Sequence, residues 1–223
     1  MKNKEIEYKY WATNIDTWEF ETTLRLALAS RKELSGAYQD DGEVKEWTLE
    51  GESPEYVHVV SCDDYYEDKL LTEKTGVQFI RFRKGGAYQQ LTLKRKTGID
   101  NVVRDELNLD ISNCSEGEIS HFLSMLGYQK TFQVYKEAWI WFFNDCHISY
   151  YTLPDKRSVI ELEAVNYETV EEGIAIIDKW EDCLRLDKLQ KEKRSLFEIY
   201  KEEANKKVTN TTTMPRLGQF IGE

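Results

Sequence analysis

Apolar and polar residues alternate along most of the chain, and this pattern predicts mainly β-strands. Short turn signals, such as Lys84-Gly85-Gly86 and Asn144-Asp145, separate the alternating stretches. Consecutive strands joined by tight turns favour an antiparallel sheet, and closure into a barrel removes its exposed edges. We therefore predict an α+β, mainly antiparallel β fold: a closed barrel of about eight strands with flanking helices. The predicted strands cover residues 5–11, 56–61, 76–83, 88–96, 101–111, 131–143, 146–153 and 158–165.

Helical periodicity covers four other stretches. The first helix is predicted after a cap at Asp16, and the second between a cap at Ser115 and the stop signal of Gly127. Two further helices are predicted, from Thr169 through Leu184 and from about residue 189 to residue 203.

The chain has no break between independent cores, so its 223 residues predict one domain. We expect that domain to cover residues 1–203. Residues 204–223 have a turn-like, polar composition and are predicted to form a flexible or loosely packed C-terminal tail. Residues 32–54 are polar and contain glycine, which predicts a hairpin or a loop.

The net charge of −11, from 41 acidic and 30 basic residues, argues against a protein that binds long nucleic acid over its surface. It is compatible with a small polyanion held by basic residues inside a cavity. The sequence has neither an apolar signal segment nor an apolar run near the length of about 20 residues that spans a bilayer. We therefore predict a cytoplasmic protein without a membrane partner.

Charged residues share one face of several predicted strands, because alternate side chains of a strand point the same way. Glu5, Glu7 and Lys9 lie on one face of the first strand, and Arg81 and Arg83 on one face of another. The charged, solvated face of an ordinary sheet explains any one of these strands. The distribution of positive and negative charge among the strands is less ordinary, because acidic pairs occur in the first and last strands and basic residues in the middle ones.

Paired glutamates supply the hard oxygen ligands that Mg²⁺ and Mn²⁺ prefer. Lys and Arg opposite them can neutralise several phosphates, and Arg grips phosphate oxygens through two donors at once. The pattern therefore suits a triphosphate that bridges a metal ion and a set of cations.

The sequence resembles the CYTH superfamily, also called triphosphate tunnel metalloenzymes. Its N-terminal ExExK motif is similar to Glu5-Ile6-Glu7-Tyr8-Lys9. Six further similarities follow in order along the chain: CDDYYED at 62–68, RxR at 81–83, TLK at 92–94, RDE at 104–106, LGY at 126–128 and ELE at 161–163. Lys193-Arg194-Ser195 is similar to the start of the helix that closes the family's domain.

This resemblance implies an eight-stranded tunnel whose inward carboxylates hold Mg²⁺ or Mn²⁺ and whose inward cations hold phosphates. It implies metal ligation by Glu5, Glu7, Glu161 and Glu163, which together with Lys9 form the implied catalytic set. It implies substrate binding by Lys9, Arg81, Arg83, Lys94, Arg104, Lys136 and Lys193, with Glu106 positioning one of the cations.

The chain departs from the family pattern at two places. Ala138 stands where the family has a second basic residue after the one that matches Lys136. Tyr150 and Tyr151 stand about ten residues before the ELE motif, where the family has an aspartate. These departures imply catalysis that is slowed, differently arranged or replaced by binding alone.

Three functions of such a tunnel remain open at this stage. The first is metal-dependent hydrolysis of a small triphosphate, such as tripolyphosphate, a nucleoside triphosphate or thiamine triphosphate. The second is a class IV adenylyl cyclase, which makes cyclic AMP from ATP. The third is a non-catalytic protein that binds a nucleotide or polyphosphate. Each is compatible with a monomer or a homodimer.

The aromatic run 139–143 can either stack on an organic ring or pack in the protein, and we favour packing. His58, His121 and His147 are scattered along the chain, so no nucleophilic triad is indicated.

Overall fold

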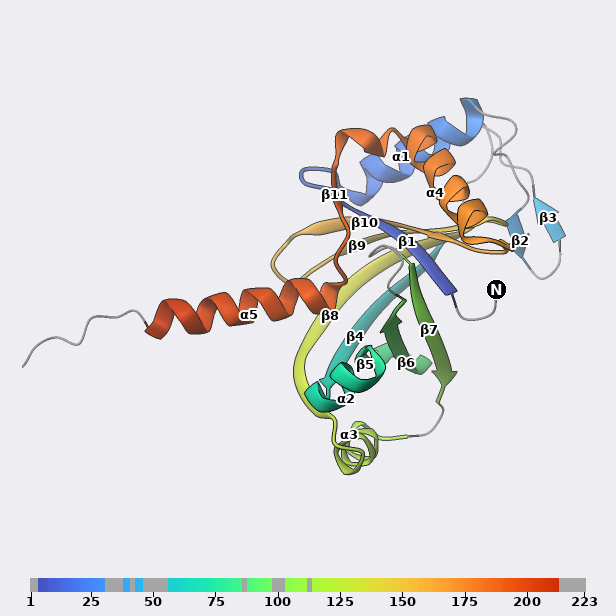
Figure 1. Ribbon diagram of the computed structural model, residues 1–223. Coiled ribbons are helices and arrows are strands. Elements are labelled where there is room, and N and C mark those ends of the chain that lie inside the picture. Colours follow the sequence, from blue (N-terminus) through green and yellow to red (C-terminus); the bar gives the residue numbers. More distant parts are fainter. Residues whose placement is uncertain are drawn as a thin grey trace, which may run out of the picture. The chain divides into compact units, whose positions relative to one another are not determined.

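The structure is a computed structural model that describes residues 4–30, 38–40, 43–45, 56–85, 88–97, 103–111 and 114–212 (Figure 1). The chain divides into two units, Met1–Lys193 and Arg194–Glu223. The strands described below belong to the first unit, and the helix α5 (Leu196–Thr212) belongs to the second. That helix extends past residue 204, where the sequence predicts a tail to begin. The predicted domain of 1–203 and tail of 204–223 stay a prediction.

Eight antiparallel strands form a closed barrel, which confirms the predicted fold class. Their order is β10-β9-β8-β4-β5-β6-β7-β1, and β1 pairs in turn with β10 to close the sheet. The short strand β11 (Gln190–Glu192) also pairs with β1. The barrel strands are β1 (Lys4–Trp11), β4 (Val57–Glu67), β5 (Val77–Gly85), β6 (Tyr88–Lys96), β7 (Val103–Asp110), β8 (Gln129–Phe142), β9 (Cys146–Thr152) and β10 (Ser158–Ala164).

Three predicted helices begin where the sequence predicts, two of them at the predicted caps Asp16 and Ser115. Asp16 accepts a hydrogen bond from the backbone N–H of Glu19 at 2.8 Å, one turn into its helix. Ser115 forms a reciprocal capping box with Glu118, and Thr169 caps its helix from the side chain. These helices are α1 (Thr17–Ser30), α3 (Glu116–Met125) and α4 (Val170–Leu184).

The prediction of a helix from about 189 to 203 is wrong in its first half. Residues 186–188 form a 3-10 turn, and residues 190–192 form β11 along the edge of β1. The helix α5 then begins at Leu196, because the Ser195 hydroxyl accepts a hydrogen bond from the Glu198 N–H at 3.2 Å. The short helix α2 (Lys69–Thr75) was not predicted.

The predicted hairpin or loop at 32–54 is partly described. Strands β2 (Tyr38–Asp40) and β3 (Glu43–Lys45) pair antiparallel, which agrees with a hairpin. The other residues of that stretch lie outside the described residues.

The main hydrophobic core lies outside the barrel, against one part of its wall. Outward residues of β1 and β10, such as Ile6 and Ile160, are fully buried together with Phe20 of α1 and Trp180 of α4. Figure 1 shows α1 and α4 over this part of the wall. Trp141, from the aromatic run, is buried in the same core, which supports the packing interpretation.

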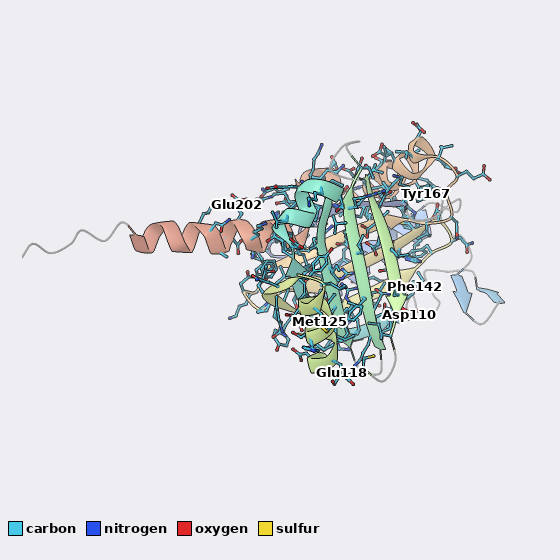
Figure 2. All side chains as sticks on the ribbon, turned by 60° about the horizontal axis from the view of Figure 1, so that its bottom comes forward. Asp110, Glu118, Met125, Phe142, Tyr167 and Glu202 are labelled. Carbon is cyan, nitrogen blue, oxygen red and sulfur yellow. The ribbon has the colours of Figure 1, made fainter. Side chains whose placement is uncertain are left out.

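A second core lies under α3, where Leu123 and Ile119 pack with Tyr66 of β4 and Phe82 of β5. Tyr66 and Phe82 are therefore outward positions that α3 covers. Arg81 and Arg83 alternate with Phe82 and therefore point to the other face of β5, which is the barrel interior. Figure 2 shows the described side chains on the barrel and its helices, with Glu118 and Met125 labelled on α3. Among the described residues, no helix is both long enough and apolar enough to cross a membrane.

Candidate functional site

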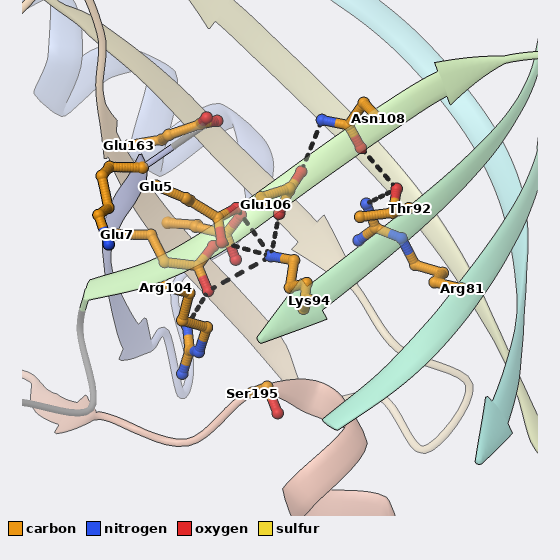
Figure 3. Close-up of polar contacts among 12 residues, drawn as sticks. Glu5, Glu7, Arg81, Thr92, Lys94, Arg104, Glu106, Asn108, Glu163 and Ser195 are labelled. Carbon is orange, nitrogen blue, oxygen red and sulfur yellow. Dashed lines mark hydrogen bonds and ion pairs between the residues drawn. The ribbon is translucent and has the colours of Figure 1, made fainter. Parts of the chain in front are cut away.

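One side of the interior holds glutamates that are clamped by lysine and arginine (Figure 3). Lys94 of β6 contacts both carboxylate oxygens of Glu5, at 2.7 and 2.6 Å, and lies 2.7 Å from Glu106 of β7. Arg104 donates to Glu7 at 2.6 Å, and Glu7 also pairs with Lys9. All three residues of the ExExK motif are buried, so the strand alternation carries them inward as expected.

The electrostatics of this cluster separate its carboxylates. Burial and repulsion from Glu7 hold the pKa of Glu5 well above its usual range. Burial also acts on Glu106, but the charges of Lys94 and Arg81 outweigh it and lower the pKa of Glu106 to about 2. The neighbouring glutamates likewise overcome burial at Lys94 and raise its pKa, so this ammonium stays charged at neutral pH.

A chain of hydrogen bonds links this cluster to Arg81 of β5 (Figure 3). Arg81 donates to the Thr92 hydroxyl at 3.0 Å, and that hydroxyl donates to the Asn108 carbonyl oxygen at 2.7 Å. The Asn108 amide nitrogen then donates to Glu106 at 2.7 Å. Sequence reasoning did not propose Thr92 or Asn108 as site residues. The sequence feature that could have indicated them is the strand alternation, which puts Thr92 on the same face as Lys94 and Asn108 on the same face as Glu106.

A second set of cations surrounds Asp63, which has a fully buried side chain. Arg83 donates from Nε and Nη2 to the two carboxylate oxygens, both at 2.8 Å, and the Lys136 ammonium lies 3.5 Å from the same group. Burial alone would raise the pKa of Asp63, but Arg83 and Lys136 hold it below its usual range. Asp63 belongs to the CDDYYED motif, yet sequence reasoning did not single it out.

Lys136 lies in an unusual environment for an ammonium. Its Nζ is 4.9 Å from the centre of the Tyr151 ring. Burial and repulsion from Arg83 lower the pKa of Lys136 to about 8, against the attraction of Asp63. The charge of this residue is therefore sensitive to pH near neutrality.

The late glutamates lie opposite the ExExK motif, because β10 pairs with β1. In this register Glu163 faces Glu7, and Glu161 faces Lys9, whose ammonium is 3.3 Å from the Glu161 carboxylate. Tyr151 donates its hydroxyl to Glu161 at 3.2 Å. A tyrosine hydroxyl therefore contacts Glu161 from a position where the resemblance calls for an aspartate.

Lys193 and Ala138 are the two remaining positions named from the sequence. Lys193 has an exposed side chain, and its backbone carbonyl accepts a hydrogen bond from Arg104 at 3.1 Å. Ala138 is buried beside Tyr151 in the β8–β9 register. The structure thus brings the predicted strand residues together, while the roles proposed for them stay predictions.

A cavity of about 430 Å³ opens within this region. Arg83, Lys136, Glu161 and Glu163 line it together with Tyr151. Its polar lining therefore combines cations with carboxylates on neighbouring parts of one wall.

The donor set suits a hard divalent cation, although the glutamates are not gathered into a metal shell. Among the described residues, no group of three or more His, Cys, Asp and Glu side chains is placed to hold a metal ion. The β1–β10 register nevertheless sets Glu7 and Glu163 side by side, and repulsion from both acts on Glu5. A bound cation would relieve this repulsion, so Mg²⁺ or Mn²⁺ remains a prediction that the local chemistry fits.

No family model matches the sequence, and no curated protein matches it. Among solved structures, a candidate adenylate cyclase from Vibrio parahaemolyticus has a TM-score of 0.61 at 14% identity, covering 90% of this chain and 99% of its own. A candidate adenylyl cyclase from Hippeastrum with a dominant triphosphatase activity has a TM-score of 0.52 at 9% identity, covering 90% and 95%.

A chain of the Mediator head module from Schizosaccharomyces pombe has a TM-score of 0.52 at 11% identity, covering 84% of this chain and 97% of its own. Such low identities establish a common fold and leave the activity to the site itself. The chain therefore shares the closed-barrel fold of these proteins, which is the fold that its sequence motifs predicted.

Proposed function

We propose that this protein hydrolyses the terminal phosphoanhydride of a small triphosphate bound inside the barrel, with Mg²⁺ or Mn²⁺. The observation that carries the proposal is the arrangement of charge in the interior. Cations from β5, β6, β7 and β8 and carboxylates from β1 and β10 converge in a closed barrel, in a chain whose net charge is −11. Such focusing favours a compact polyanion over a long one.

Arg81, Arg83 and Lys136 are suited to hold phosphate oxygens. The Nε of Arg81 is buried and has no hydrogen-bond partner among the residues that the structure describes, so an anionic oxygen would satisfy it. Arg83 and Lys136 both contact the Asp63 carboxylate, and Glu161 attracts both from further away. An anionic ligand would add to these attractions, because both side chains line the cavity. These groups would stabilise charge on the phosphoryl group as it transfers.

Glu5, Glu7, Glu161 and Glu163 would hold the metal ion. The ion would supply Lewis acidity at a phosphoryl oxygen and lower the pKa of a bound water. Lys94 and Lys9 pair with these glutamates and would exchange a carboxylate for a phosphate oxygen when substrate binds. No covalent intermediate is required.

A non-catalytic binder is the second candidate, and a specific observation favours it. The glutamates are neutralised by Lys9, Lys94 and Arg104, and Tyr151 occupies the position of the expected aspartate. Such a protein would bind a nucleotide or polyphosphate without turning it over.

The test is product analysis with tripolyphosphate, ATP, GTP and thiamine triphosphate, each with Mg²⁺ or Mn²⁺. We expect phosphate release that falls by about 100-fold or more in Glu161→Gln/Glu163→Gln. Glu137→Gln is the matched control, because Glu137 is exposed on β8 and pairs with His58.

Each result discriminates among the functions. Pyrophosphate with cyclic AMP would make the protein a cyclase. Tight binding without any product, with both metals, would establish the binder. Phosphate release that survives the double substitution would contradict the proposed metal site.

A further inference from the structure

One wall of the cavity is apolar. Its residues are Val57 and Val59 of β4 and Ala138, Ile140 and Phe142 of β8, which we call the apolar wall. Val57 is 51% exposed and Phe142 37% exposed. A ligand that covered these side chains would remove apolar surface from water, which favours binding.

The apolar wall continues directly from the cationic part of the same strands. In the β4–β8 register Ser61 faces Lys136, Val59 faces Ala138, and Val57 faces Ile140. The inward positions of β8 therefore change from a cation to apolar residues within two positions. Four residues of a strand span about 13 Å, so Lys136 and Ile140 are separated by about the length of a phosphate chain joined to a ring.

The next strand of the barrel, β9, brings polar groups to the cavity beside the apolar wall. Ser149 and His147 of β9 line the cavity with Glu163, and His147 Nδ1 lies 3.8 Å from the Glu163 carboxylate. In the β8–β9 register Ser149 faces Ile140, and His147 faces Phe142. A group bound here would contact the apolar side chains of β4 and β8 and the hydrogen-bonding side chains of the neighbouring β9, which is the composition of a site for a small organic group.

We propose that the apolar wall binds the organic group of an organic triphosphate, so that the substrate is a triphosphate ester rather than bare tripolyphosphate. The inference rests on the proposed function of the same tunnel and narrows it. Bare tripolyphosphate would contact the Arg83–Lys136 end and leave the apolar wall to water. A cavity of about 430 Å³ has room for both parts of an ester.

The test compares affinities for tripolyphosphate, β,γ-imido-ATP and phenyl triphosphate by titration calorimetry. We expect at least one organic probe to bind about tenfold more tightly than tripolyphosphate. Val59→Ser should weaken that probe by about fivefold to tenfold and leave tripolyphosphate unchanged. Val60→Ser is the matched control, because Val60 is the next residue and is 61% exposed outside the cavity.

Ala138→Lys provides the converse test. It places a second cation beyond Lys136, so we expect affinity for tripolyphosphate to rise and affinity for the organic probe to fall. Thermal unfolding of each variant checks that it is folded. If Val59→Ser does not fold, Ile140→Thr takes its place.

Two negative results are distinguishable. If tripolyphosphate binds as tightly as both organic probes and Val59→Ser changes neither, the inference is overturned while the triphosphate tunnel stands. If none of the three ligands binds to folded protein, the proposed function fails and the inference fails with it.

Discussion

At the scale of single residues, the ammonium of Lys136 is the group most open to a functional test. It lies among Arg81, Arg83, Asp63 and Glu161, and its pKa is lowered to about 8. Because the folded-state pKa lies below the ordinary value, the charged form is present below about pH 8 and is lost as pH rises through it. Anion binding that uses this charge must weaken over the same window.

We therefore expect affinity for tripolyphosphate to fall between pH 7 and pH 9.5, by at most about tenfold per pH unit. Lys136→Arg should remove this dependence, since a guanidinium stays charged throughout that range. The ratio of the two affinities cancels the ionisation of the ligand itself. Parallel pH profiles for the two proteins would show that Lys136 does not contact the phosphates.

The sequence predicts the charged residues of the site better than it predicts their partners. Alternation marks Glu5, Lys94 and Glu161 as inward, because charge on the opposite face from apolar residues is visible in one strand. It does not reveal that Asp63 pairs with Arg83, twenty residues away, since that depends on the register of β4 and β5. The same holds for Asn108, whose polar side chain is ordinary in an exposed strand.

At the scale of elements, α3 illustrates how a helix fixes the barrel wall. Its capping box determines where it begins, and Leu123 turns toward Tyr66 and Phe82. The sequence shows the start of the helix as a cap, its buried face as an apolar spacing and its end as a terminal glycine. The helix from 189 was mispredicted because β11 is held by pairing with β1, which local sequence does not encode.

We predict that Leu123→Ala lowers the free energy of unfolding by about 2–4 kcal/mol, because it leaves a cavity in the second core. Leu123 is 1% exposed, whereas the adjacent Phe122 is 55% exposed. Phe122→Ala is therefore the matched control and should cost less than about 1 kcal/mol. Chemical denaturation measures both. Equal costs for the two variants would mean that α3 does not dock through Leu123.

At the scale of the whole molecule, both hydrophobic cores and the predicted strand residues of the site come from residues before 194. The closure of the sheet could be expected from the number of strands and their tight turns, while the crossovers that put β8 beside β4 could not. β4 and β8 are not consecutive strands in the sequence, so no turn signal between them predicts their pairing.

We expect a chain that ends at Glu203 to keep its midpoint of thermal unfolding within about 2 °C of the full chain. Its affinity for tripolyphosphate should also be unchanged. Calorimetry on the two chains measures both quantities. A fall of about 10 °C or a loss of binding would mean that residues 204–223 belong to the tunnel domain.

Each barrel strand divides its residues between two tasks. Many outward side chains enter the cores beneath α1, α3 and α4, and inward ones line the tunnel. The residues at the inward positions of the strands can thus change while the packed exterior is kept. Proteins that descend from one ancestor can in this way change the ligand that the tunnel binds, or lose catalysis, while each protein along the lineage still folds.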